Sequence, residues 1–72
     1  MTKFILIIWV CSFLGQYHCM PPIQSSILYD SWYECSRTAH QESIKMLSIL
    51  GYEQVNDGKL ATRYMCKAEE II

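Results

Sequence analysis

The residues whose chemistry could go beyond structure are the four cysteines and two histidines of this chain. A nucleophilic site needs a nucleophile, a base and an orienting group held together. Cys35 and His40 come nearest to this, but five residues on a helix place two side chains about 140° apart. His18 lies within an N-terminal segment that resembles a signal sequence. We therefore predict no catalytic residue and no enzymatic activity.

A metal site is the second chemistry that these residue types allow. Cys35, His40 and Cys66 would supply three ligands, one short of the four that a structural zinc site holds. Thiolate and thioether sulfur also suits soft metals, so an exported copper or zinc binder is one alternative function. The methionines that follow the first segment are Met20, Met46 and Met65. Because a methionine on an apolar helix stripe more often fills a gap in the core, we predict no metal site and no cofactor.

The N-terminal segment has the layout of a secretory signal peptide. Lys3 precedes the uncharged, largely apolar run Phe4–Leu14, and a basic start followed by about 7–15 apolar residues is the typical pattern. The run is shorter than the roughly 20 residues that span a bilayer. We predict a signal peptide over residues 1–20, cleaved near Cys19 or Met20, and a domain over residues 21–72. The localisation would then be periplasmic or secreted.

Other interpretations of this segment stay open because residues 16–20 contain no small-residue cleavage motif. An uncleaved signal would anchor a small protein in the inner membrane, which is the second alternative function. Acylation of Cys19 would make a lipoprotein. The segment could also be a buried strand or helix of a cytosolic domain.

Export would decide the state of the remaining cysteines. Cys11 would leave with the signal peptide and Cys19 lies at the cleavage region, so Cys35 and Cys66 remain. Two cysteines on inward faces of an exported domain predict a disulfide. On the chain-entropy model this bond contributes roughly 3–4 kcal/mol. A domain of about 50 residues has a marginal core and needs such a staple.

One long amphipathic helix is predicted over residues 32–50. Ser31 and Glu34 form a capping box at its start, and Gly51 follows its last apolar residue, where a positive φ is expected. The opposite stripe is polar. The apolar stripe consists of Trp32, Cys35, Ala39, Ser43, Met46, Leu47 and Leu50.

Short strands are predicted on both sides of this helix. Residues 27–29 form a brief β-prone run after a linker at residues 21–26, and residues 52–55 could form another strand before a turn at residues 56–58. Leu60, Thr62, Tyr64 and Cys66 alternate as one inward face of a strand. Residues 67–70 are predicted as a polar tail, with Ile71 and Ile72 frayed. The fold class is α+β, with one long helix on a two- or three-stranded sheet.

The disulfide constrains how the last third of the chain runs. A tight hairpin at residues 52–66 would leave Cys66 about 20 Å from Cys35, whereas bonded cysteines need Cα atoms within about 7 Å. We favour a compact connection over residues 52–58, with residues 59–67 running back beside residues 27–29 in a right-handed β-α-β unit. The alternative is a real hairpin with Cys66 bonded to a retained Cys19.

Charge and exposed aromatics bear on the kind of partner. After Met20 the chain has five basic and seven acidic residues, a net charge of −2. This balance argues against nucleic acid as a partner, and leaves a membrane contact only through the N-terminal segment. Tyr33 and Tyr52 are predicted as a partner surface, because an exposed aromatic on a small rigid domain can dominate binding.

Three short motifs resemble a known group of proteins. They are Tyr33-Glu34-Cys35, Glu53-x-Val55-Asn56 and Arg63-x-x-Cys66, within about 35 residues. With them the chain resembles the short, signal-peptide-bearing, functionally uncharacterised proteins of marine bacteria and their phages. The resemblance implies an exported helix-plus-strand domain with a cysteine pair. The resemblance implies nothing about activity. Because the chain shows a signal-like segment and no catalytic group, our leading hypothesis is a non-enzymatic interaction protein whose partner is an envelope or periplasmic protein.

Overall fold

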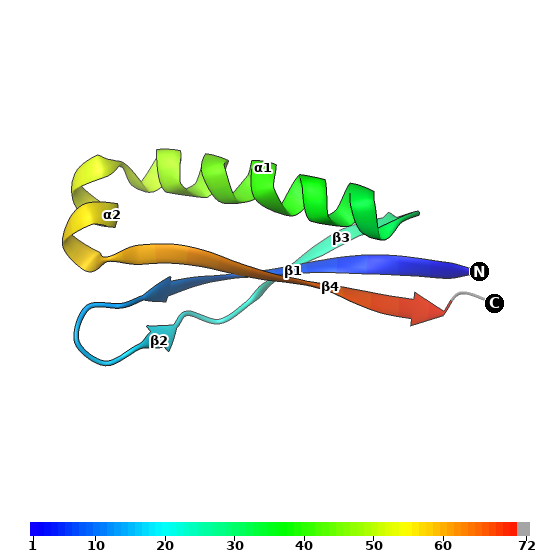
Figure 1. The fold of residues 1–72 in the computed structure, drawn as a ribbon, viewed down its shortest axis with the longest axis horizontal. Coiled ribbons are helices and arrows are strands. Elements are labelled where there is room, and N and C mark those ends of the chain that lie inside the picture. Colours follow the sequence, from blue (N-terminus) through cyan, green and yellow to red (C-terminus); the bar gives the residue numbers. More distant parts are fainter. Residues whose placement is uncertain (71–72) are drawn as a thin grey trace.

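A computed structural model describes residues 1–70, which form a four-stranded antiparallel sheet and two helices (Figure 1). The α+β class is as predicted, but the prediction of one long helix on two or three strands is wrong. In chain order the elements are β1 (Thr2–Ser12), β2 (His18–Cys19), β3 (Ile23–Tyr29), α1 (Trp32–Leu50), α2 (Tyr52–Gly58) and β4 (Leu60–Glu70).

The first strand, β1, is the centre of the sheet. Along one edge it pairs with all of β4, from Thr2 opposite Glu70 to Ser12 opposite Leu60. Along the other edge it pairs with β3 and, near its end, with β2. Its isoleucines, valine and tryptophan are residues that favour strands. The segment predicted as a signal peptide or signal anchor is therefore a strand here, and its role as a signal stays a prediction.

The crossover through the helices joins β3 to β4, with β1 between them. Both strands run antiparallel to β1, so they are parallel to each other. The prediction that residues 59–67 lie directly beside residues 27–29 is wrong. The physical reason is that β1 pairs with β4 continuously over eleven residues and so lies between β4 and β3. The prediction contained no such strand, because it interpreted these residues as a signal segment. β3 also begins earlier than predicted, at Ile23, within the expected linker.

Helix α1 has the predicted bounds. The side chain of Ser31 accepts a hydrogen bond from the Glu34 N–H at 3.1 Å, as the capping box predicts. At the other end Gly51 has a φ of 91°, and its N–H donates to the Leu47 carbonyl at 3.0 Å. A positive φ suits glycine because it has no Cβ. Local sequence signals therefore set both ends of this helix.

Residues 52–58 form the short helix α2, so the prediction of a strand at residues 52–55 is wrong. The Gly51 carbonyl accepts a hydrogen bond from the Val55 N–H at 3.1 Å, which starts a new helix directly after α1 ends. Lys59 then adopts a left-handed conformation with a φ of 51°. The chain turns back within this compact connection, which is the path predicted from the distance limit on a Cys35–Cys66 disulfide.

Strand β4 continues through the residues predicted as a polar tail. It extends to Glu70, because β1 pairs with it as far as Thr2. The Thr2 hydroxyl donates to a Glu70 carboxylate oxygen at 2.9 Å. The fraying predicted for Ile71 and Ile72 lies outside the described residues.

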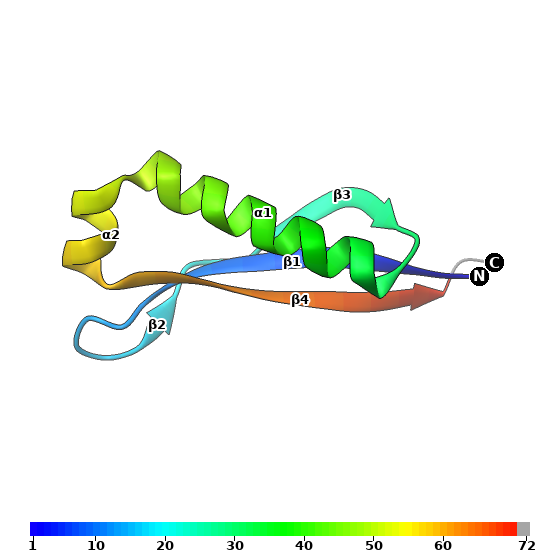
Figure 2. The same cartoon turned by 45° about the horizontal axis from the view of Figure 1, so that its top comes forward.

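One layer of side chains between α1 and the sheet forms the core. Figure 2 shows α1 lying across one face of the sheet. The buried members of this layer are Leu6, Ile8, Cys35, Ala39 and Cys66. Trp32, placed on the apolar stripe from the sequence, is 56% exposed, and its ring touches the Phe4 ring of β1 edge-on, with centroids 5.9 Å apart.

Candidate functional site

The Cys35–Cys66 disulfide ties the first turn of α1 to β4. The Cα atoms are 6.2 Å apart, and both side chains are buried. This is the pairing that the sequence predicts. It forms because α1 and α2 carry the chain away and β4 brings it back along the whole of β1, which returns Cys66 to the level of Cys35.

A small polar group surrounds Tyr64 beside this disulfide. The Ser36 and Tyr64 hydroxyl oxygens lie 2.8 Å apart in a hydrogen bond. The His40 ring meets the Tyr64 ring edge-on, with centroids 5.3 Å apart. His40 thus packs on an aromatic ring, and Cys35 is held in a disulfide, so a Cys35–His40 nucleophilic pair does not form in this arrangement. The predicted inward face of the last strand contacts α1 through both Tyr64 and Cys66.

The second disulfide joins Cys11 to Cys19 and was not predicted. The two residues face each other across β1 and β2, with Cα atoms 3.9 Å apart. The turn between them contains Gly15 with a φ of 68°, and the Tyr17 hydroxyl lies 3.3 Å from the Cys19 sulfur. The eight-residue spacing around a glycine was the available signal. The bond was not predicted, because the signal-peptide interpretation removes Cys11 with residues 1–20 and places Cys19 at the cleavage region.

These disulfides also bear on metal binding. All four cysteines are bonded in pairs, so none offers the thiolate that soft metals prefer. Within residues 1–70 there is no group of three or more histidine, cysteine, aspartate or glutamate side chains that could hold an ion.

The two tyrosines predicted as a partner surface are both strongly exposed, Tyr33 at 68% and Tyr52 at 83%. The fold does not bring them together. Tyr33 is in the first turn of α1 and Tyr52 opens α2, so the length of α1 separates them (Figure 1). At ~1.5 Å per residue this is about 28 Å. They are two separate exposed sites.

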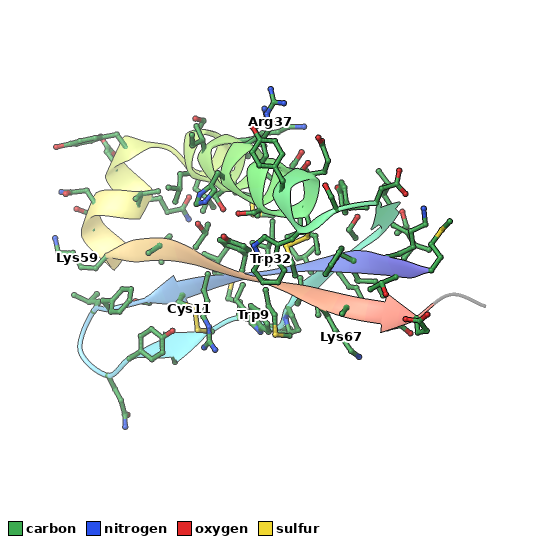
Figure 3. The ribbon with its side chains drawn as sticks, turned by 45° about the vertical axis from the view of Figure 1, so that its right-hand side comes forward. Trp9, Cys11, Trp32, Arg37, Lys59 and Lys67 are labelled. Atoms are coloured by element: carbon green, nitrogen blue, oxygen red, sulfur yellow. A yellow bond between two sulfur atoms is a disulfide. The ribbon has the colours of Figure 1, made fainter. Side chains whose placement is uncertain are left out.

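The face of the sheet turned away from α1 carries a further apolar surface, which we call the open face. It is formed by Ile5, Ile7, Trp9 and Met65, the residues that alternate with the core positions of β1 and β4. Figure 3 shows Trp9 on the side of the sheet opposite the helix. The Arg63 guanidinium lies over the Trp9 ring, 5.3 Å from its centroid, a cation–π distance. This face was not predicted from the sequence, because the signal-peptide interpretation places β1 outside the domain.

A shallow groove of about 220 Å³ lies between α1 and β3. Its walls are apolar, and Glu42 of α1 supplies a carboxylate at its side. β3 pairs with β1 at Ile23–Gln24 and again at Leu28–Tyr29, and the register shifts between these two stretches. Ser25 and Ile27, which lie within the irregular stretch, line the groove. The apolar lining consists of Leu6, Ile8, Ile23, Ile27, Tyr29 and Met46.

Comparison of the chain with protein-family models, with curated proteins and with solved structures finds no match. Neither helix in residues 1–70 combines the length and apolar character needed to cross a bilayer. The class that the fold and the cysteines define is thus a small α+β domain stapled by two disulfides. Such bonds persist in oxidising environments.

Proposed function

We propose that this chain is an exported, non-enzymatic interaction protein that works in the envelope or periplasm. The observation that carries the proposal is the pairing of all four cysteines into two disulfides. Reducing compartments keep thiols free, whereas exported proteins retain such bonds. A small domain gains the most from them, because its core alone is marginal.

Exposed aromatic side chains support the interaction part of the proposal. Tyr33 and Tyr52 stand out from α1 and α2 with most of their surface in solvent. Large aromatic side chains often supply most of the binding energy at a protein interface. The partner would be an envelope or periplasmic protein that contacts one of these two sites.

We also propose that residues 1–20 stay on the folded chain. β1 is the strand with which β2, β3 and β4 pair, and Cys11 is bonded to Cys19. Cleavage near Cys19 would remove this strand and leave the core residues of β4 without their partners. The membrane-anchored alternative conflicts with the same contacts, because residues buried in a bilayer cannot pair with β4.

Intact mass of the exported protein tests location and retention together. The expected mass is that of the full chain less four hydrogens, found in the exported fraction. Alkylation should add nothing before reduction and four labels after it. A product beginning near Met20 would refute retention, while a cytosolic product with free thiols would refute the proposal of export.

A photo-crosslinking amino acid tests the two tyrosine sites in cells. Introduced at Tyr33 or Tyr52, it should form an adduct with an envelope protein under light. Lys45 is a matched control, because it is exposed on α1 between the two tyrosines. If neither tyrosine position gives an adduct beyond that of Lys45, the partner-surface proposal is wrong.

A further inference from the structure

We propose that the free edge of β4 pairs with β4 of a second copy of this chain. The two strands would run antiparallel about a two-fold axis at Cys66 and join both sheets into one. This inference goes beyond the proposed function, because it concerns the chain's own copy rather than an envelope partner.

The first support is the length of the free edge. β4 has eleven residues and, within residues 1–70, pairs only with β1. Its other side therefore presents a row of backbone groups that can pair with another strand. The chain has no proline in β4, which would block such pairing. At the opposite edge β3 is shorter, its pairing is irregular, and Pro22 directly precedes it.

The second support is charge complementarity along β4. Arg63, Lys67 and Glu69 alternate with Cys66 and so lie on the open face. The described residues contain two ion pairs, from the N-terminus to Glu70 and from Lys3 to Asp30, and neither uses these three side chains. Centring the antiparallel pairing on Cys66 sets Arg63 of each copy directly opposite Glu69 of the other. Opposite charges placed this way stabilise paired strands.

The neighbouring registers are disfavoured by the same rule. Centring on Met65 sets Arg63 opposite Lys67 in both halves of the interface. Centring on Lys67 sets the two Lys67 side chains opposite each other. Like charges directly opposite are destabilising. Among the registers centred on Met65, Cys66 and Lys67, the charges of β4 therefore favour the one centred on Cys66, which pairs residues 62–70 of each copy.

The helix side of the sheet also fits this arrangement. The disulfide holds the first turn of α1 above Cys66, and thus beside the two-fold axis. Tyr33 is three residues before Ser36, whose hydroxyl bonds Tyr64 of β4. Residues three apart share a helix flank, so Tyr33 lies on the flank above β4. The exposed Tyr33 rings of the two copies would approach each other across the axis.

The test is the mass in solution of the purified, oxidised full-length chain, measured by sedimentation from micromolar to millimolar concentration. We expect a concentration-dependent dimer. Arg63→Glu and Glu69→Arg, each alone, turn two attractive pairs into repulsive ones and should weaken dimerisation about tenfold or more. A one-to-one mixture of the two variants should restore it, because one chain then carries two acids at these positions and the other two bases.

Lys45→Glu is the matched control, since it reverses an exposed charge on α1 far from the β4 edge. It should leave the dimer unchanged. A chain that stays monomeric throughout would overturn the proposal. So would a dimer that is insensitive to both reversals, or variants whose mixture fails to associate although each shows native circular dichroism. None of these results would bear on export or on an envelope partner bound at Tyr52.

Discussion

The two disulfides of this protein fasten two very different regions. Cys35–Cys66 links a helix to a strand across 31 positions of sequence, and both its residues are buried in the core. Cys11–Cys19 links two neighbouring strands across 8 positions, at one end of the sheet. The first holds two layers together, while the second closes a hairpin that backbone pairing already brings near.

Loop length gives the two bonds different weights. On the chain-entropy model a closed loop of about 30 residues contributes roughly 3–4 kcal/mol, and a loop of about 8 residues roughly 2–3 kcal/mol. The buried bond also fixes where α1 starts on the sheet, and so which side chains meet Tyr64. The sheet is held together by the pairing of β2, β3 and β4 with β1. The position of α1 on that sheet is fixed by the Cys35–Cys66 disulfide.

Removing β1 should have the largest effect on stability, because it tests whether the disulfide-bonded helix layer can fold without the central strand. A chain beginning at Met20 keeps Cys35 and Cys66 but lacks the strand with which β2, β3 and β4 pair. We expect no cooperative unfolding transition, because the core loses Leu6 and Ile8. Thermal unfolding followed by circular dichroism measures this. A sharp transition in the shortened chain would show that the buried disulfide can organise the domain without its central strand.

Replacing Cys35 and Cys66 together by alanine should have the next largest effect. Alanine avoids placing a hydroxyl in a site that is fully buried. We expect the free energy of unfolding to fall by about 3–4 kcal/mol, measured by urea denaturation. If the loss is under 1 kcal/mol, the bond does not hold the helix layer as argued.

The Cys11→Ala/Cys19→Ala variant is the direct counterpart. The expected loss is about 2–3 kcal/mol, because the loop is shorter. Hydrogen exchange should show the loss concentrated near β2, with the amides of α1 still protected. Equal or greater destabilisation than in the Cys35/Cys66 variant would reverse the order of the two bonds.

The smallest expected effect on stability is the loss of the N-cap at the start of α1, the end of the helix that the Cys35–Cys66 disulfide also holds. Ser31→Ala removes the hydrogen bond from the Glu34 N–H and should cost about 1 kcal/mol, or a melting temperature lower by about 4–8 °C. Ser48→Ala, at an exposed site on the same helix, is the control and should change stability by less than about 0.5 kcal/mol. Equal melting temperatures for the two variants would show that the Ser31 cap does not stabilise α1.

Local signals in the sequence were enough to predict the helix, and the inward positions of Cys35 and Cys66 in an exported domain were enough to predict one disulfide. Ser31, Glu34 and Gly51 bracket α1 at its observed bounds, because capping depends on residues a few positions apart. The alternation of Tyr64 and Cys66 placed an inward face on the last strand. The limit of about 7 Å on bonded cysteines then favoured a compact connection over residues 52–58, which the structure forms as α2.

Tertiary structure alone decided the place of the first strand and everything that follows from it. An uncharged apolar run after a lysine has the same composition whether it enters a membrane pathway or the middle of a sheet. The strand that pairs along one whole edge of it, β4, lies 48 to 68 positions further along the chain, as in Ser12 with Leu60 and Thr2 with Glu70. The open face around Trp9 and the free edge of β4 both result from that pairing. No local pattern could reveal these two features, because each depends on contacts between segments distant in sequence.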